Sequence, residues 1–140
     1  MVLVSACLAG VNCRYNGGNH EDVRIVQLVK EGKALPVCPE QLGGLTTPRN
    51  PAEITRDGRV LTEKGEDVTK QFVLGAEETL RLCRLYGCKV AILKSLSPSC
   101  GSGHIYDGTF KKVITEDDGL TAKLLKENGI QVLTESERAV

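Results

Sequence analysis

The sequence predicts an α/β fold, in which residues 1–140 form a small single domain with a mostly parallel, Rossmann-like sheet flanked by helices. Two observations lead to this prediction. Short apolar runs of strand length alternate along the chain with longer segments whose apolar residues recur at helical spacing. The length of 140 residues suffices for one hydrophobic core and is short for two ordinary domains.

Four short apolar runs are the predicted strands, at residues 2–6, 35–38, 90–94 and 130–133. The first is rich in β-branched residues, as expected of a strand buried on both faces. A strand, a helix and a further strand in one sheet form a right-handed crossover in which the two strands are parallel. We therefore expect the four strands to point the same way.

The predicted helices occupy residues 20–31 and 68–86 and a segment around 120–127. The longest carries an apolar stripe and is followed by Gly87, a typical residue just past a helix end. The Asp57-Gly58 pair between two short apolar runs predicts a hairpin. Residues 105–113 are predicted to be irregular or a second hairpin.

The composition argues against several classes of partner. Basic and acidic side chains balance at 18 each, so no overall field attracts nucleic acid or anionic lipid. With two Phe, three Tyr and no Trp, the chain lacks material for a base-stacking surface. No apolar run has the length of a membrane span or a leader. We expect a cytoplasmic protein with no membrane contact and no RNA substrate, and the sequence does not indicate the oligomeric state.

Three of the six cysteines occupy equivalent places relative to the predicted strands. Cys7 follows the first strand, Cys38 ends the second, and Cys100 lies in the loop after the third. In an open parallel sheet these positions share the carboxyl edge, where such folds bind ligands. Each cysteine also has Gly or Pro nearby, which lets main-chain N–H groups turn toward a site. We therefore predict that the three thiols form one metal site.

The other three cysteines receive different predictions. Cys83 falls on the apolar stripe of the longest helix and is expected in the core. Cys88 opens the third strand at its amino end and should face away from the crevice. Cys13 follows Cys7 by six residues, and the sequence leaves open whether it lies at the site or is structural.

Thiolates are soft ligands that favour zinc, copper(I) or iron–sulfur clusters. Structural zinc sites usually space their cysteines closely, as in C-x-x-C, and the chain has no such pair. An iron–sulfur cluster accepts ligands far apart in sequence, and three cysteines on a four-iron cluster leave one iron open to a substrate. The alternatives are a non-catalytic iron–sulfur or zinc-binding protein that uses the same cysteines, with Cys13 as a possible fourth zinc ligand, or a redox role for the thiols.

Polar residues in the same loops suggest chemistry at this site. The carboxylate two residues after Cys38 is a candidate general acid or base, and three hydroxyls surround Cys100. Two guanidinium groups offer the bidentate fork that suits an anionic group. The candidates are Glu40, Ser97, Ser99, Ser102, Arg14 and Arg49. Each also has a structural interpretation, since serines often cap turns and surface carboxylates are common.

Several segments together resemble the thiouracil desulfidase family, long catalogued as a domain of unknown function. The resemblance follows the chain in order through nearly its whole length. It rests on Ser5-Ala6-Cys7-Leu8-Ala9-Gly10, Cys13-Arg14-Tyr15-Asn16-Gly17, Pro36-Val37-Cys38-Pro39-Glu40, Thr47-Pro48-Arg49, Ser97-Pro98-Ser99-Cys100-Gly101-Ser102-Gly103 and Ile105-Tyr106-Asp107-Gly108-Thr109-Phe110. Asn16 stands where the family pattern often has Asp, and Ala9 where it often has Leu.

The resemblance implies a [4Fe-4S] cluster held by Cys7, Cys38 and Cys100 with one open iron. It implies a non-redox hydrolysis that removes sulfur from a thiolated pyrimidine base or nucleotide, such as thiouracil or thiouridine monophosphate, and releases hydrosulfide. The catalytic carboxylate of the family corresponds to Glu40, and its serine corresponds to Ser97 or Ser99. These departures, together with a segment 115–119 that is less glycine-rich than the family pattern, leave the preferred substrate open, because loop residues set specificity.

Overall fold

The fold was analysed in a computed structural model that describes residues 1–137. The central strands are β1 (Val2–Ser5), β2 (Ala34–Val37), β5 (Val90–Leu93) and β8 (Gln131–Thr134). The helices are α1 (Val23–Lys30), α2 (Pro39–Leu42), α3 (Thr69–Tyr86) and α4 (Leu120–Glu127), with a 3₁₀ helix η1 (Ala6–Ala9) directly after β1. The predicted α/β class is confirmed.

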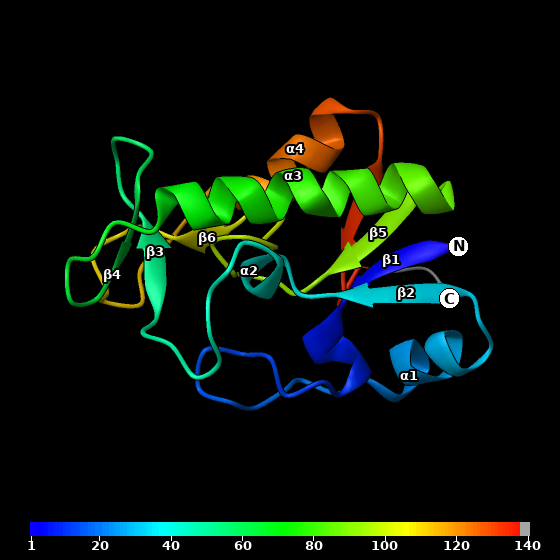
Figure 1. The fold of residues 1–140 in the computed structure, drawn as a ribbon. Coiled ribbons are helices and arrows are strands. Elements are labelled where there is room, and N and C mark those ends of the chain that lie inside the picture. Colours follow the sequence, from blue (N-terminus) through cyan, green and yellow to red (C-terminus); the bar gives the residue numbers. More distant parts are fainter. Residues whose placement is uncertain (138–140) are drawn as a thin grey trace.

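The central sheet has the strand order β2-β1-β5-β8, and all three pairings are parallel. In the register, Leu3 of β1 lies between Leu35 of β2 and Ala91 of β5. Every strand therefore ends at the same edge, as predicted. Figure 1 shows α3 and α4 on one face of this sheet and α1 on the other.

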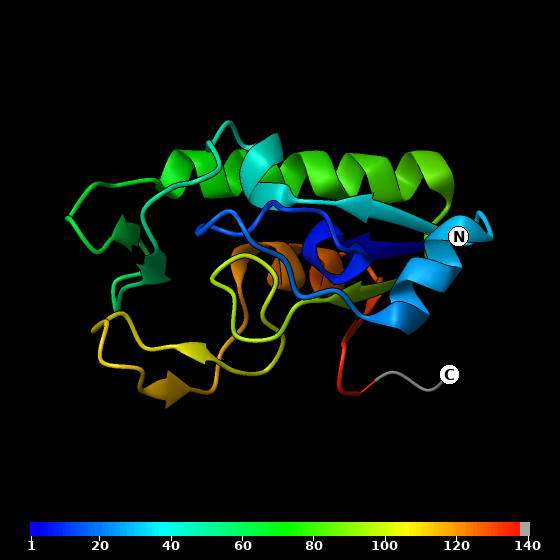
Figure 2. The ribbon, with the colours of Figure 1, turned by 90° about the horizontal axis from the view of Figure 1, so that it is seen from below.

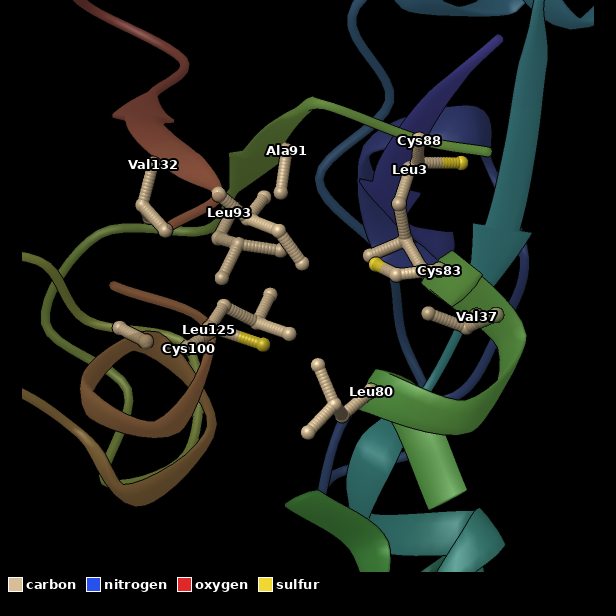
Figure 3. Packing of buried hydrophobic residues seen from close by; sticks show 12 residues of the cluster. Leu3, Val37, Leu80, Cys83, Cys88, Ala91, Leu93, Cys100, Leu125 and Val132 are labelled. Carbon is tan, nitrogen blue, oxygen red and sulfur yellow. The ribbon is translucent and has the colours of Figure 1, made fainter. Parts of the chain in front are cut away.

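Each face of the sheet has its own apolar core. Leu3 and Leu93 point toward α3 and α4, where they pack with Leu80, Cys83 and Leu125 (Figure 3). On the α1 face a second cluster contains Val4, Leu8, Cys13, Ile25 and Ile92. Successive residues of β1 thus bury opposite faces of the sheet, so the sheet is enclosed on both sides, as parallel sheets usually are.

Helix α3 confirms the predicted apolar stripe, since Phe72, Ala76, Leu80 and Cys83 are all buried. It ends at Gly87, whose positive φ of 65° provides the left-handed cap that a side chain would disfavour. The chain then returns as β5. The prediction that Cys83 is a core residue is confirmed.

Two small hairpins lie beyond the carboxyl ends of the central strands (Figures 1 and 2). Strands β3 (Ala52–Ile54) and β4 (Val60–Thr62) form the antiparallel pair predicted around Asp57-Gly58. The second pair, β6 (Ile105–Tyr106) and β7 (Ile114–Thr115), is shorter and encloses an irregular segment. These hairpins extend the fold on the side where the cysteine loops lie. Among residues 1–137, no helix combines the length and hydropathy that crossing a membrane requires.

Helix α2 lies directly on the backbone of α3. A Cβ atom placed on Gly75 would collide with the carbonyl oxygen of Pro39, and one placed on Gly43 would collide with the carbonyl oxygen of Gln71. Glycine at both positions therefore permits the main chains to touch. This contact sets the position of the segment that follows β2.

Candidate metal centre

The carboxyl edge of the sheet brings the three predicted cysteines to adjacent places. Cys7 lies in η1 after β1, Cys38 is the N-cap residue of α2 after β2, and Cys100 follows β5. Because β2, β1 and β5 are neighbours, their ends are neighbours too. Cys7 and Cys100 are 7% and 5% exposed, and Cys38 is partly exposed, so the sulfur group is largely shielded from water.

Cys13 adds a fourth thiol to this group. Its side chain is 2% exposed and lies in one buried cluster with Cys7, against which Cys38 packs. The Cys38 Sγ also donates to the main-chain carbonyl of Cys13 across 3.8 Å. The sequence left the place of Cys13 open, and the structure puts it at the centre.

Burial favours the neutral form of the thiols of Cys13, Cys38 and Cys100. It raises the pKa of Cys100 to about 12. The hydrogen bond with Cys13, followed by burial, raises the pKa of Cys38 well above its usual range. For Cys13 the bond from Cys38 acts in the opposite direction, but the bond with Cys7 and burial outweigh it and raise the pKa to about 11. A bound cation would supply the positive charge that thiolates need here.

The loop of Cys100 is held by its own polar groups. The Ser97 Oγ accepts hydrogen bonds from the N–H groups of Ser99 (3.1 Å) and Cys100 (3.0 Å). The Ser5 Oγ at the end of β1 accepts from the N–H of Lys94 at 2.9 Å and also contacts the Cys100 thiol. These bonds tie the third cysteine to the end of the central strand.

The catalytic candidate Glu40 lies at the start of α2, two residues after Cys38. Its Oε1 accepts a hydrogen bond from Nε of Arg49 at 3.0 Å, and the two side chains are 19% and 8% exposed. The glycine contact described above positions α2, and Arg49 orients the carboxylate on it. Glu40 thus has a defined orientation at the mouth of the centre.

Arg49 connects three segments around the centre. Besides Glu40, its guanidinium donates to the carbonyl of Thr46 (3.1 Å), to Oγ1 of Thr47 (2.8 Å) and to the carbonyl of Cys13 (2.9 Å). Four of its N–H contacts are therefore made within the protein. This arrangement shows that Arg49 organises the site, and the contact with an anionic group that the sequence suggested stays a prediction.

The three serine candidates differ in their surroundings. Ser99 is 1% exposed, and its hydroxyl shares a 2.7 Å hydrogen bond with Thr121 of α4, so it joins the loop to that helix. Ser97 is partly exposed, and as an acceptor in the turn it keeps its own proton available for donation. Ser102 is partly exposed in the loop after Cys100.

Sequence reasoning did not predict a polar group beside the centre at the ends of β5 and β8. Lys94 Nζ lies 3.1 Å from Glu135 Oε2, and the Ser95 hydroxyl donates to the same carboxylate oxygen at 3.0 Å. Burial and the nearby cations of Arg14 and Lys94 lower the pKa of His20. Arg14 lies over the ring of Tyr15, 5.6 Å from its centroid. The feature of the sequence that could have indicated the Lys94–Glu135 pair was the position of Lys94 at the end of a predicted strand.

A cavity of about 510 Å³ adjoins the centre on the side of the β3–β4 hairpin. Glu40 and Arg49 line it together with polar side chains that include Asn50 and Glu66, and with apolar ones such as Phe72. Small-molecule sites commonly have volumes of about 300–1,000 Å³ and mix apolar walls with a few polar groups. Glu40, two residues after Cys38, lines this cavity, whereas the cysteines do not.

The donor set fits an iron–sulfur cluster. The ligand atoms available are soft sulfurs in a shielded pocket, as such clusters require. Within residues 1–137, no three His, Cys, Asp or Glu side chains converge on one position for a single ion. A cluster needs no such convergence, because its thiolate ligands bind different irons and stand apart from one another.

The fold and the site define a class of protein: a small α/β domain with a cysteine-rich centre at the carboxyl edge of a parallel sheet. Residues 2–137 match the family model described as 2-thiouracil desulfurase, and the chain belongs to this family.

Two relatives cover almost the whole chain. A solved structure, the [4Fe-4S]-dependent thiouracil desulfidase TudS, superimposes with a TM-score of 0.90 at 48% sequence identity, over 96% of this chain and 90% of that one. The uncharacterized protein YbbK of Bacillus subtilis (strain 168) is 45% identical over 98% of this chain and 97% of its own length. The family resemblance found in the sequence is confirmed.

Proposed function

We propose that this chain is a [4Fe-4S]-dependent desulfidase that removes sulfur from thiolated pyrimidines by hydrolysis. The observation that carries the proposal is the placement of Cys7, Cys38 and Cys100 at one sheet edge, beside the Glu40 carboxylate and a cavity of ligand size. Family membership and the solved relative named for this activity support it.

Cys7, Cys38 and Cys100 would hold the cluster. Cys38 directly follows β2, Cys7 lies in the 3₁₀ helix after β1, and Cys100 lies in the loop after β5, so all three lie at the carboxyl edge of the sheet. When bound, a cluster with three protein ligands supplies a Lewis-acidic iron with an open position for the thiocarbonyl sulfur. The sulfur ligands lie in the protein interior, where electrostatic interactions are stronger than in water.

The reaction converts a C=S bond and one water molecule into a C=O bond, hydrosulfide and a proton, with no change in the number of electrons. Glu40 would hold the attacking water and take its proton. The bond from Arg49 occupies one side of the carboxylate, which leaves the other oxygen available to the water. Ser97, which keeps a free hydroxyl proton in the turn before Cys100, would bond the substrate or the leaving sulfur.

Arg49 and Arg14 have different roles in this proposal. Arg49 orients Glu40 and the Cys13 segment through its internal hydrogen bonds. Arg14 and Ser102, which lie in the two loops that border the centre, remain candidates for contact with the substrate. A thiolated base or nucleotide would bind in the cavity, next to the part of its wall that Glu40 forms.

The test is sulfide release from 2-thiouracil by anaerobically reconstituted protein. Glu40→Gln should keep its iron and sulfide and lose about 10²–10⁴ in kcat, the usual contribution of a positioned acid or base. Glu66→Gln is the matched control, because Glu66 lines the same cavity and bonds Asn50 and Thr62 instead. It should retain activity within a factor of about ten.

Two results would contradict the proposal. If cluster-loaded wild-type protein releases no sulfide from thiouracil or thiouridine monophosphate, the chain is a non-catalytic cluster protein or acts on another substrate. If the reconstituted protein takes up zinc and no iron, the metal assignment is wrong. A loss below tenfold in Glu40→Gln would remove only Glu40 from the mechanism.

A further inference from the structure

The side chain of Glu53 joins the two hairpins that lie beyond the carboxyl ends of the central strands (Figure 2). Glu53 lies in β3, and its Oε1 accepts hydrogen bonds from the N–H groups of Gly108 at 3.0 Å and of Phe110 at 3.1 Å. Both donors belong to the segment between β6 and β7. One carboxylate oxygen of the first hairpin therefore holds two main-chain groups of the second, and the proposed reaction does not use this residue.

The main chains of the two hairpins touch at the same place. A Cβ atom placed on Gly108 would lie 2.6 Å from the carbonyl oxygen of Ile54 and 3.0 Å from the Cα of Thr55. Phe110 has a positive φ of 60°, which is uncommon for a residue with a bulky side chain. Such a conformation persists where surrounding contacts hold it, and the bond from the Phe110 N–H to Glu53 is one of these contacts. The 108–110 segment is thus fitted closely to β3.

The β3–β4 hairpin is anchored to α3 and carries part of the cavity wall. Val60 is fully buried, and its N–H donates to Oγ1 of Thr69, the first residue of α3, at 2.9 Å. Ala52 and Thr62, which pair across this hairpin, line the cavity. Because side chains alternate between the two faces of a strand, Glu53 points to the face opposite that of Ala52. The junction with the second hairpin therefore lies behind this part of the cavity wall.

The β6–β7 hairpin is anchored instead to the loop of Cys100. A Cβ atom placed on Gly101, directly after Cys100, would lie 2.8 Å from Cγ2 of Ile105 in β6, so this strand packs closely on the loop. Ile105 is 2% exposed and forms a parallel bridge with Leu96, which lies before Cys100 in the same loop. Ser102, a candidate for contact with the substrate, lies between Gly101 and Ile105. The second hairpin therefore continues the side of the site that this loop forms.

We propose that Glu53 is a positioning residue for substrate binding, because it joins the cavity wall on β3–β4 to the side of the site formed by the loop after β5. This inference rests on the proposed function. Each hairpin has its own anchor, so the fold can persist without Glu53, but the distance between the two sides of the site would no longer be fixed. The contact between α2 and α3 places Cys38 and Glu40 independently of the hairpins. Loss of Glu53 should therefore weaken substrate binding and leave the chemical step unchanged.

The experiment has two readouts. The first is kcat and KM for sulfide release from 2-thiouracil by reconstituted protein, with iron and sulfide per chain measured in every variant. The second is amide hydrogen exchange of the 105–115 segment in the metal-free protein, which reports the junction without any activity.

Four variants are compared with the wild-type chain. Glu53→Ala removes the acceptor, whereas Glu53→Gln keeps an amide oxygen that can accept both bonds. Gly108→Ala disturbs the same junction from the second hairpin, so the inference stays testable even where Glu53→Ala does not fold. Glu63→Ala is the matched control, because it removes an exposed carboxylate directly after β4 in the same hairpin.

The expected result is a rise in KM of about tenfold in Glu53→Ala and Gly108→Ala, with kcat and iron content within about threefold of wild type. In Glu53→Ala the 105–115 segment should exchange about tenfold faster, because the Gly108 and Phe110 amides lose their acceptor. Glu53→Gln should stay close to wild type in KM and in exchange. Glu63→Ala should match wild type in both readouts.

Three outcomes would overturn the inference. An unchanged KM in Glu53→Ala would show that the junction does not affect the substrate site. A lower kcat or iron content with an unchanged KM would show a purely structural role, because unfolding reduces the active fraction and not the affinity. A Glu53→Gln variant as impaired as Glu53→Ala would show that the two hydrogen bonds are not responsible. Each of these results leaves the proposed desulfidase intact, whereas cluster-loaded wild-type protein that releases no sulfide would refute the proposed function and this inference together.

Discussion

Replacement of Arg49 by methionine tests whether its internal hydrogen bonds hold the centre together. The side chain is 8% exposed and makes four contacts, to Glu40, Thr46, Thr47 and the Cys13 carbonyl. Methionine fills part of the volume but makes none of these bonds. The Glu40 carboxylate and the Cys13 carbonyl would then lose their partner in a largely buried place.

The magnitude follows from these contacts. Hydrogen bonds to charged groups contribute about 1.5–3 kcal/mol each, and removal of one member of a buried ion pair costs about 3–5 kcal/mol. The partial exposure of Glu40 and Thr46 lets water replace some of the lost bonds. We therefore expect Arg49→Met to lower the free energy of unfolding of the metal-free protein by about 3 kcal/mol. Arg49→Lys can replace one bond and should cost about 2 kcal/mol.

The assay is urea denaturation at neutral pH, followed by circular dichroism. Arg59→Met is the matched control, because Arg59 Nε bonds Asp57 Oδ2 at 2.8 Å with both side chains more than half exposed. Exposed pairs contribute about 0–1 kcal/mol, so this control should change little. An Arg49→Met variant within 1 kcal/mol of wild type would refute the view that Arg49 organises the site.

Three further predictions concern the packing and polar contacts around the centre. Gly75→Ala should displace α2 by forcing a Cβ against the Pro39 carbonyl, and reconstituted protein should hold less than half of the wild-type iron. Ser97→Ala should reduce kcat for sulfide release about 10²-fold, whereas Ser99→Ala should keep activity and lose about 1–2 kcal/mol of stability with its bond to α4. Burial raises the pKa of Glu135, but hydrogen bonds from main-chain N–H groups and from Lys94 outweigh burial and lower this pKa. The contribution of Glu135 to stability is therefore present above its unfolded-state pKa and is lost as the pH falls through its folded-state pKa. Glu135→Gln should therefore destabilise the protein more at pH 7 than at pH 3.

Controls and contradicting results accompany these predictions. For Gly75→Ala the control is Glu77→Ala, which changes an exposed residue of the same helix, and this variant should bind a normal amount of iron. A full amount of iron in Gly75→Ala would contradict the view that the contact between α2 and α3 positions the cluster site. An unchanged kcat in Ser97→Ala would exclude that hydroxyl. Glu127→Gln, at the exposed end of α4, is the control for Glu135→Gln, and an equal loss of stability at both pH values would show that titration of Glu135 is not responsible.

The sequence predicted the fold well because its signals are local. Strand-length apolar runs and the Asp57-Gly58 turn depend on neighbours in the chain, and the structure confirms them. The placement of Cys7, Cys38 and Cys100 at the carboxyl edge of the sheet was predictable because parallel strands end at the same edge. Their role as ligands remains a prediction.

Contacts between segments far apart in sequence were not predictable. The bond from Arg49 to the carbonyl of Cys13 spans 36 positions and leaves no periodic trace in the sequence. The sequence therefore did not indicate that Arg49 organises the site. Likewise Ser97 and Ser99 were equivalent in sequence, and only the position of Thr121 separates them. The pairing of Lys94 with Glu135 depends on the register of β5 and β8.

The glycine contact between α2 and α3 has a consequence for engineering. The distance between α2 and α3 is set by contact between their main chains, which a change of side-chain rotamer cannot adjust. Substitutions elsewhere in the core should therefore hardly move Cys38 and Glu40. The β3–β4 and β6–β7 hairpins are not part of this contact between α2 and α3. Libraries that vary the β3–β4 hairpin, which contributes Ala52 and Thr62 to the cavity wall, should therefore change which molecules enter the cavity while the reactive groups keep their spacing.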